Sequence, residues 1–134
     1  MNSLHVSQYK SGKSLAFKTD MTLETAVNIL LNSQQIGGPV IDHAGRVIGW
    51  LSEQDCLAKM IEASYYCELV ALVEDVMVKN VVTVKGDMSI VDLAQLMLKT
   101  TPKIYPVIDD EDHYIGLISR KNVLAAMAKQ FEKC

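Results

Sequence analysis

The chain has 134 residues, a formal charge of −3 and a hydrophobic content of 49%, which suits one compact soluble domain. Its lysines and arginines form no block, so neither nucleic acid nor an anionic membrane is an expected partner. The apolar run at residues 69–73, like every other unbroken apolar run in the sequence, is far shorter than the roughly 20 residues of a membrane helix. The first residues also lack the apolar centre of a signal peptide, and we therefore expect a cytoplasmic protein.

The spacing of cysteine and histidine gives no sign of a metal site. Cys56, Cys67 and Cys134 form no C-x-x-C pair, and an odd number of cysteines cannot close completely into intrachain disulfides. No two histidines or cysteines lie at the spacing of metal ligands. Reduced thiols and no bound metal are therefore expected.

An internal repeat organises the chain. Shifted by 67 residues, the sequence aligns with itself without a gap, and 14 of the 46 positions from 15 to 60 are identical. The matches include the tetrapeptide Pro-Val-Ile-Asp, which begins at Pro39 and again at Pro106. Two copies of one structural unit are therefore expected.

The first helix of each copy is predicted from its start and its apolar spacing. A short apolar strand, residues 15–17 or 81–84, precedes Thr22 or Ser89, whose hydroxyl can cap a helix by accepting from free backbone N–H groups. Apolar residues then recur at helical spacing, so both helices are expected to face the core. These residues are Leu23, Ala26, Val27, Leu30 and Leu31 in the first copy and Ile90, Leu93, Ala94, Met97 and Leu98 in the second.

A hairpin and a second helix complete each copy. Glycine and proline end the first helices, and β-branched residues follow them as strands. Polar turns at 43–45 and 110–112 lead into further strands, after which new helices start at Ser52 and Ser119. The order β-α-β-β-α, repeated twice, belongs to the mixed α/β (α+β) class.

The segment between the copies, residues 60–77, is mostly apolar and longer than a loop requires. It is either an extended second helix followed by a linker, or a surface for self-association. The expected division is 1–66 for the N-terminal segment, first copy and extended helix, and 67–134 for the linker and second copy. A copy of about 45 residues is small for an independent core, so the copies are expected to pack together.

The repeated pattern identifies a family. Each copy reads h-P-V-h-D…h-G-h-h-S-x-x-D/N, and the second copy is preceded by D-V-M at 75–77 and N-V-V-T-V at 80–84. This pattern resembles the cystathionine β-synthase (CBS) domain, and two such units in tandem resemble a Bateman module. The resemblance covers roughly residues 10–130.

The resemblance implies two units packed about a pseudo-two-fold axis, with clefts at their junction for AMP, ADP, ATP or S-adenosylmethionine. It also implies a regulatory protein, often a homodimer, that is usually attached to an enzyme, channel or transporter. With 134 residues, this chain is not expected to include such an attached domain. We therefore expect a free sensor, or regulation of an unidentified protein in trans.

The S-x-x-D/N motif supplies the first candidate ligand contacts. Free N–H groups and a serine hydroxyl at a helix start suit a phosphate, which makes Ser52 and Ser119 phosphate-side candidates. A carboxylate or amide three residues later can accept from a ribose diol, so Asp55 and Asn122 are ribose-side candidates. The same motif is also close to a capping box that satisfies only the backbone, and the two interpretations do not exclude each other.

The two helix starts differ in charge. Glu53 beside the first motif would repel a phosphate, whereas Arg120 and Lys121 supply positive charge at the second. The resemblance places an adenine slot at the first strands and around the prolines of the tetrapeptides. Its residues would be Leu15, Ala16, Gly38 and Pro39 in the first copy and Val82, Thr83, Tyr105 and Pro106 in the second.

Two aromatic residues have alternative roles. Tyr105 could stack on a purine or simply cover the sheet edge. Trp50 either fills the core, which is the favoured interpretation, or lines a cleft wall.

Two functions stay open. One is a regulatory sensor that binds an adenosine-containing ligand and signals by a conformational change. The other is a structural interaction and dimerisation module without a ligand. An enzyme is not expected, because the sequence contains no nucleophile beside a base, no H-x-x-x-H and no G-x-x-x-x-G-K motif, and no cofactor is required.

Overall fold

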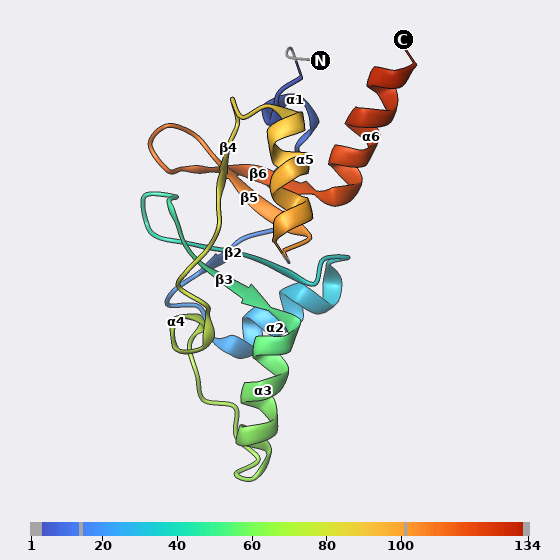
Figure 1. Ribbon diagram of the computed structural model, residues 1–134. Coiled ribbons are helices and arrows are strands. Elements are labelled where there is room, and N and C mark those ends of the chain that lie inside the picture. Colours follow the sequence, from blue (N-terminus) through green and yellow to red (C-terminus); the bar gives the residue numbers. More distant parts are fainter. Residues whose placement is uncertain (1–3, 14, 101, 133–134) are drawn as a thin grey trace. The chain divides into compact units, whose positions relative to one another are not determined.

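The computed structural model describes residues 4–13, 15–100 and 102–132 (Figure 1). These residues form two compact units, each with its own core and its own three-stranded sheet. Residues 15–81 make up the first-repeat unit, and residues 4–13 with 82–132 make up the second-repeat unit. The mixed α+β class predicted from the sequence is confirmed.

The first-repeat unit follows the predicted order. A short strand is followed by a helix, a hairpin, a second helix and one further helical turn. The elements are β1 (Phe17–Lys18), α2 (Leu23–Asn32), β2 (Gly37–Ile41), β3 (Val47–Ser52), α3 (Glu53–Ser64) and α4 (Val73–Val76).

The second-repeat unit has the same order, with one additional helical turn from the start of the chain. Its elements are α1 (Val6–Tyr9), β4 (Val84–Lys85), α5 (Ile90–Lys99), β5 (Ile104–Ile108), β6 (Tyr114–Ser119) and α6 (Arg120–Phe131).

The repeat extends to the pairing of individual residues. In both units the first strand is parallel to the second and the second is antiparallel to the third. Val40 pairs with Gly49, and 67 residues later Val107 pairs with Gly116. Both sheets shift register directly after these valines. The first strands are shorter than predicted, because only two residues of each pair with a neighbour.

The predicted helix starts are confirmed. The Thr22 hydroxyl accepts from the Thr25 amide at 3.2 Å, and the Ser89 hydroxyl accepts from the Asp92 amide at 3.0 Å. Each cap satisfies one of the backbone donors that a helix start leaves open.

The core-facing prediction holds for most of these two helices and is wrong at their ends. The buried residues are Leu23, Ala26 and Leu30 in α2 and Ile90, Leu93 and Met97 in α5. Leu31 and Leu98 are 75% and 88% exposed. The eight residues from Leu23 to Leu31 turn the helix by about 80° beyond whole turns, which moves Leu31 off the buried face.

The segment between the repeats packs against the first-repeat unit. Its helix, α3, ends at Ser64. The Leu23 amide then donates to the Ala71 carbonyl and the Val73 amide to the Met21 carbonyl, both at 2.9 Å. Val73 is fully buried in the first core. The first compact unit therefore extends to residue 81.

The N-terminal segment packs against the rest of the second-repeat unit. The Val6 amide donates to the Met88 carbonyl at 2.9 Å, and the Ser11 amide donates to the Leu117 carbonyl at 2.8 Å. Val6 is fully buried in the second core. Among the described residues, no helix is both long and apolar enough to cross a lipid bilayer.

Candidate functional site

The candidate residues of the two S-x-x-D/N motifs lie where the last strand of each unit meets a helix, β3 with α3 and β6 with α6 (Figure 1). Ser52 ends β3 and pairs with Gly37, and Ser119 ends β6 and pairs with Ile104. The extended backbone of each serine turns directly into the first residue of α3 or α6. Pairing within the sheet therefore holds each serine at its helix start.

Ser52 and Asp55 form a complete capping box. The Ser52 hydroxyl accepts from the Asp55 amide at 3.1 Å and donates to Asp55 Oδ2 at 2.7 Å. The Ser52 amide also donates to Oδ2, at 3.2 Å. The box thus uses one carboxylate oxygen of Asp55, and Oδ1 takes no part in it.

Ser119 and Asn122 build the same box. The Ser119 hydroxyl accepts from the Asn122 amide at 3.2 Å, and both the hydroxyl and the amide of Ser119 donate to Asn122 Oδ1 at 2.9 Å. The capping interpretation of both motifs is therefore confirmed. In this arrangement each serine proton is already donated within the protein.

The box leaves few backbone donors for an anion. The Glu53 amide donates to the Ile36 carbonyl at 2.8 Å, and the Arg120 amide donates to the Lys103 carbonyl at 2.9 Å. Within the described part of the chain, the hydrogen bonds leave only Gln54 and Lys121 with an unused amide in these first turns. A phosphate would therefore depend mainly on side-chain charge.

The charge difference between the two helix starts is present in the structure. The first turn of α3 carries Glu53 and Asp55, whereas the first turn of α6 carries no acid. Arg120 and Lys121 are exposed, and neither forms an ion pair with another described residue. Both cations are thus available to a ligand.

Cys56, the residue after Asp55, is not a nucleophile candidate. Its side chain is buried in the first core. Burial raises the pKa of its thiol, and the nearby charges of Asp55 and Glu53 raise it further. The thiol therefore stays protonated and unreactive near neutral pH. Cys67 is also a free thiol, and Cys134 lies outside the described residues.

The predicted adenine-slot residues differ in exposure. Gly38, Pro39 and Pro106 are buried in strands β2 and β5, and Leu15 is buried in the first core. A Cβ on Gly38 would lie 2.9 Å from the Leu15 side chain, so this strand has no room for a larger residue. Less buried residues complete the predicted slot: Ala16 and Thr83 are half-buried, and Val82 is exposed.

The two aromatic residues require corrections. Tyr105 is 0% exposed within the second core, and its hydroxyl is hydrogen-bonded to the Thr100 hydroxyl. Its ring fills the core, so a stacking role does not fit this position. Trp50 is half-buried and lies outside the core, contrary to the favoured interpretation. Its backbone forms a bridge to Val78 through two hydrogen bonds of 2.9 Å.

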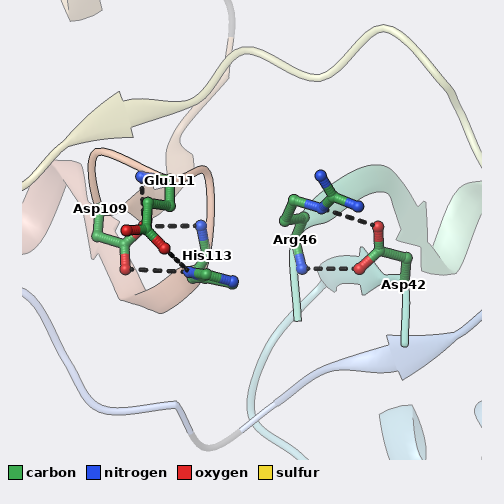
Figure 2. Close-up of polar contacts among 5 residues, drawn as sticks. All are labelled: Asp42, Arg46, Asp109, Glu111 and His113. Carbon is green, nitrogen blue, oxygen red and sulfur yellow. Dashed lines mark hydrogen bonds and ion pairs between the residues drawn. The ribbon is translucent and has the colours of Figure 1, made fainter. Parts of the chain in front are cut away.

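The two hairpin turns are expected from the sequence only as polar connections, and the structure shows a built arrangement in each (Figure 2). In the β2–β3 turn, Asp42 Oδ1 accepts from the amides of Ala44 and Arg46 at 2.9 and 3.0 Å. Asp42 Oδ2 lies 3.3 Å from the Arg46 Nε. The aspartate thus ties the turn together from within.

The β5–β6 turn repeats this arrangement with a different cation (Figure 2). Asp109 Oδ1 accepts from the amides of Glu111 and His113, both at 2.9 Å. Asp109 Oδ2 lies 3.3 Å from His113 Nδ1. The signal in the sequence is an identical aspartate in both tetrapeptides, followed four residues later by a basic residue.

The described residues offer no candidate metal site. Across the described ranges, no group of three or more His, Cys, Asp or Glu side chains is arranged to hold a metal ion.

Comparison with protein families finds one match that occurs twice. The CBS domain matches residues 6–62 and again residues 73–129. An uncharacterized protein of Methanocaldococcus jannaschii, MJ1426, is 25% identical over 86% of this chain and 86% of its own length. The inosine-5'-monophosphate dehydrogenase of the same organism is 30% identical over 78% of this chain, which covers 20% of that enzyme.

Solved structures share the fold over almost the whole chain. The CBS-pair protein CBSX2 from Arabidopsis thaliana has a TM-score of 0.81 and 25% identity, with 98% of both chains covered. A structure of CBSX2 in complex with AMP gives a TM-score of 0.80 at 25% identity, over 95% of this chain and 98% of that one. The CBS domain pair of MJ0100 has 19% identity and a TM-score of 0.77, over 94% of this chain and 97% of that one, which shows likeness of fold.

Proposed function

Because the chain belongs to the CBS domain family, with domains at residues 6–62 and 73–129, we propose that it is a regulatory module for an adenosine-containing ligand. The observation that carries this proposal is the serine-led helix start that both units build in the same way. The complex of CBSX2 with AMP supports it, since that protein is alike over nearly the whole chain. The candidate ligands are AMP, ADP, ATP and S-adenosylmethionine.

The proposed ribose contact is Asp55. Its Oδ1 lies outside the capping box, so a diol could donate to it while Oδ2 continues to cap α3. Charge-assisted hydrogen bonds of this kind are stronger than those to a neutral amide. Asn122 offers the weaker acceptor at the equivalent position.

The proposed phosphate contacts are Arg120 and Lys121, with Ser52 and Ser119 beside the helix starts. The two cations are exposed and unpaired within the described residues. The serine protons are already donated, so each serine would have to rotate before it could donate to a phosphate. The proposed adenine contacts are the backbone near Gly38 and Pro39 in the first-repeat unit, and the backbone near Val82, Thr83 and Pro106 in the second-repeat unit.

The module would act on a partner by a change of conformation when the ligand binds. A ligand can shift a conformational equilibrium only by its difference in affinity for the two states. The partner is an unidentified protein in trans, and a homodimer in the cytoplasm is the proposed working form. We assign no catalytic step.

One observation favours the second function, a structural module without ligand. Both capping boxes are complete without any added group, and Tyr105 belongs to the core. Every feature of the two serine motifs would then be explained by helix stability.

A thermal-shift screen separates the two functions. AMP, ADP, ATP, NAD and S-adenosylmethionine are each added to the full chain. A ligand at 100 times its dissociation constant stabilises the folded state by about 2.7 kcal/mol, which gives a clear rise in unfolding temperature. No shift and no calorimetric binding with any of the five would favour the structural module.

A further inference from the structure

The two hairpin turns are built alike, but they differ in the group that balances the aspartate charge. Arg46 in the β2–β3 turn keeps its charge at every pH the folded protein meets. His113 occupies the same place in the β5–β6 turn, and a histidine ordinarily changes charge between about pH 5 and 8. One turn therefore has a permanent cation and the other a conditional one.

The β5–β6 turn also carries more negative charge to balance. Residues 109–112 are four consecutive acids, whereas the equivalent residues 42–45 include only Asp42. His113 Nδ1 lies 3.7 Å from Glu111 Oε2 as well as 3.3 Å from Asp109 Oδ2. Lys85 Nζ, 3.7 Å from Asp110 Oδ1, is the only other described cation that forms an ion pair with these acids.

The β5–β6 turn also contains a residue in a left-handed backbone conformation. Asp112 has a φ of +68°, a left-handed conformation that costs a residue with a side chain more than it costs glycine. The equivalent residue of the β2–β3 turn is Gly45, with a φ of +84°. The β5–β6 turn therefore depends more on its side-chain contacts.

Other titratable groups face this turn from two neighbouring segments. A groove of about 410 Å³ is lined by His5 and Ser7 from the N-terminal segment and by Gly86 and Asp87 from the loop after β4. On the hairpin side, its lining includes Asp109 and Asp110. His5 is therefore a second histidine on the acidic side of the turn, and the test must separate it from His113.

We propose that the β5–β6 turn is a pH-sensitive clamp, in which protonated His113 forms ion pairs with Asp109 and Glu111 and holds the turn more tightly than neutral His113 does. The ion pairs exist only while the imidazole is charged, so the turn is tighter at the acidic end of the range in which histidine titrates. The β2–β3 turn keeps its Asp42–Arg46 pair throughout.

The aspartate remains charged over the same range. The His113 amide, followed by the Glu111 amide and the His113 charge, lowers the pKa of Asp109, although partial desolvation opposes this. Its carboxylate is therefore available whenever His113 is protonated near or below neutral pH. The clamp does not require the proposed adenosine ligand.

Amide hydrogen exchange of the full chain tests the clamp, with the other turn as internal control. The measured quantity is the protection factor of the Glu111 amide divided by that of the Ala44 amide, because each donates to the equivalent aspartate. Between about pH 5.5 and 7.5 we expect this ratio to fall about two- to fivefold, the range for exposed ion pairs. High salt should reduce the change.

Three variants assign the change to a side chain. His113→Arg should give the high ratio at both pH values, and His113→Gln should give the low ratio at both. His5→Gln should keep the pH dependence of the parent. A parent ratio that does not change with pH, or a pH dependence that survives His113→Gln, would overturn the proposal.

Discussion

Single residues decide between capping and ligand binding in this chain, and Asp55 is the clearest case. Its two carboxylate oxygens have different surroundings, since Oδ2 accepts both hydrogen bonds of the capping box. Asn122 shows that an amide oxygen can accept the same two bonds. Capping and ribose recognition can therefore be separated by changing the charge alone.

We expect Asp55→Asn to change the free energy of unfolding by less than about 1 kcal/mol, because the cap is kept. If Oδ1 accepts from a ribose diol, the affinity for the nucleotide should fall roughly tenfold or more. Calorimetric titration with the ribose and 2′-deoxyribose forms of the nucleotide measures this affinity. Removal of the 2′-hydroxyl should reduce the affinity of the variant less than it reduces the affinity of the parent. Four equal affinities would assign Asp55 to capping alone.

Arg120 and Lys121 test the phosphate contact. Replacement of both by alanine should weaken nucleotide binding by about ten- to a hundredfold, the range for charge-assisted hydrogen bonds, and should leave adenosine almost unaffected. The matched control is alanine at Glu53 and Gln54, the equivalent positions of the first repeat. Equal losses for adenosine and ATP would show that the two cations do not bind phosphate.

The lowered pKa values of Asp42 and Asp109 predict that the protein becomes less stable in acid. The amide of Arg46 is the main cause that lowers the pKa of Asp42, and the amide of His113 is the main cause that lowers the pKa of Asp109. A carboxyl whose folded pKa lies below its unfolded value stabilises the fold above the unfolded value, near 4, and loses this as pH falls through the folded value.

The urea concentration at the unfolding midpoint should therefore decrease as the pH is lowered from about 5 to about 3. The double variant Asp42→Asn, Asp109→Asn keeps an oxygen for the turn amides and removes the charge. Its urea midpoint should depend less on pH than that of the parent. An unchanged pH dependence would mean that other acids account for the acid sensitivity.

At the scale of elements, the N-terminal segment is held against the second sheet by close backbone contact. Gly116 in β6 has a φ of +153°, and a Cβ on it would lie 2.2 Å from the Ser11 carbonyl oxygen. The carbonyl belongs to backbone whose amide donates to Leu117, so it cannot move without loss of that bond.

Gly116→Ala should therefore destabilise the chain by about 1–3 kcal/mol and expose the N-terminal segment to protease. Gly12→Ala is the matched control, because a Cβ there meets nothing within 4 Å. Denaturation midpoints and limited proteolysis measure the two effects. Equal stability of both variants would show that the contact between the segment and β6 is not important for folding.

At the scale of the whole molecule, the exposed apolar residues at the end of α3 bear on self-association. Ile61 and Tyr65 are 66% and 85% exposed, as expected for a surface that binds another protein. Leu69 and Leu72, which belong to the same apolar segment, are half-buried, and Leu69 packs against the first core. The proposed surface is therefore smaller than the apolar pattern indicates.

Light scattering at tens of micromolar should report a dimer, or a dimer of dimers, for the parent. Ile61→Ser with Tyr65→Ser should shift the mass toward the monomer without loss of folding, since both side chains are exposed. A parent that scatters as a monomer of 14.9 kDa would contradict the prediction.

The sequence by itself determined the repeat, the element order and the helix starts. Capping residues and apolar spacing act over a few neighbouring residues, so the local sequence is enough to identify Thr22, Ser52, Ser89 and Ser119 as caps. The same local signals carried the family pattern, whose two copies account for the CBS match.

Only the tertiary structure decided which distant segments pack together. The contact of Val6 with the second core, the burial of Tyr105 and the exposure of Leu98 depend on residues far away in the chain. The spacing of apolar residues predicts that one face of a helix or strand will be buried. Which segment packs on that face is decided by contacts between residues far apart in the sequence.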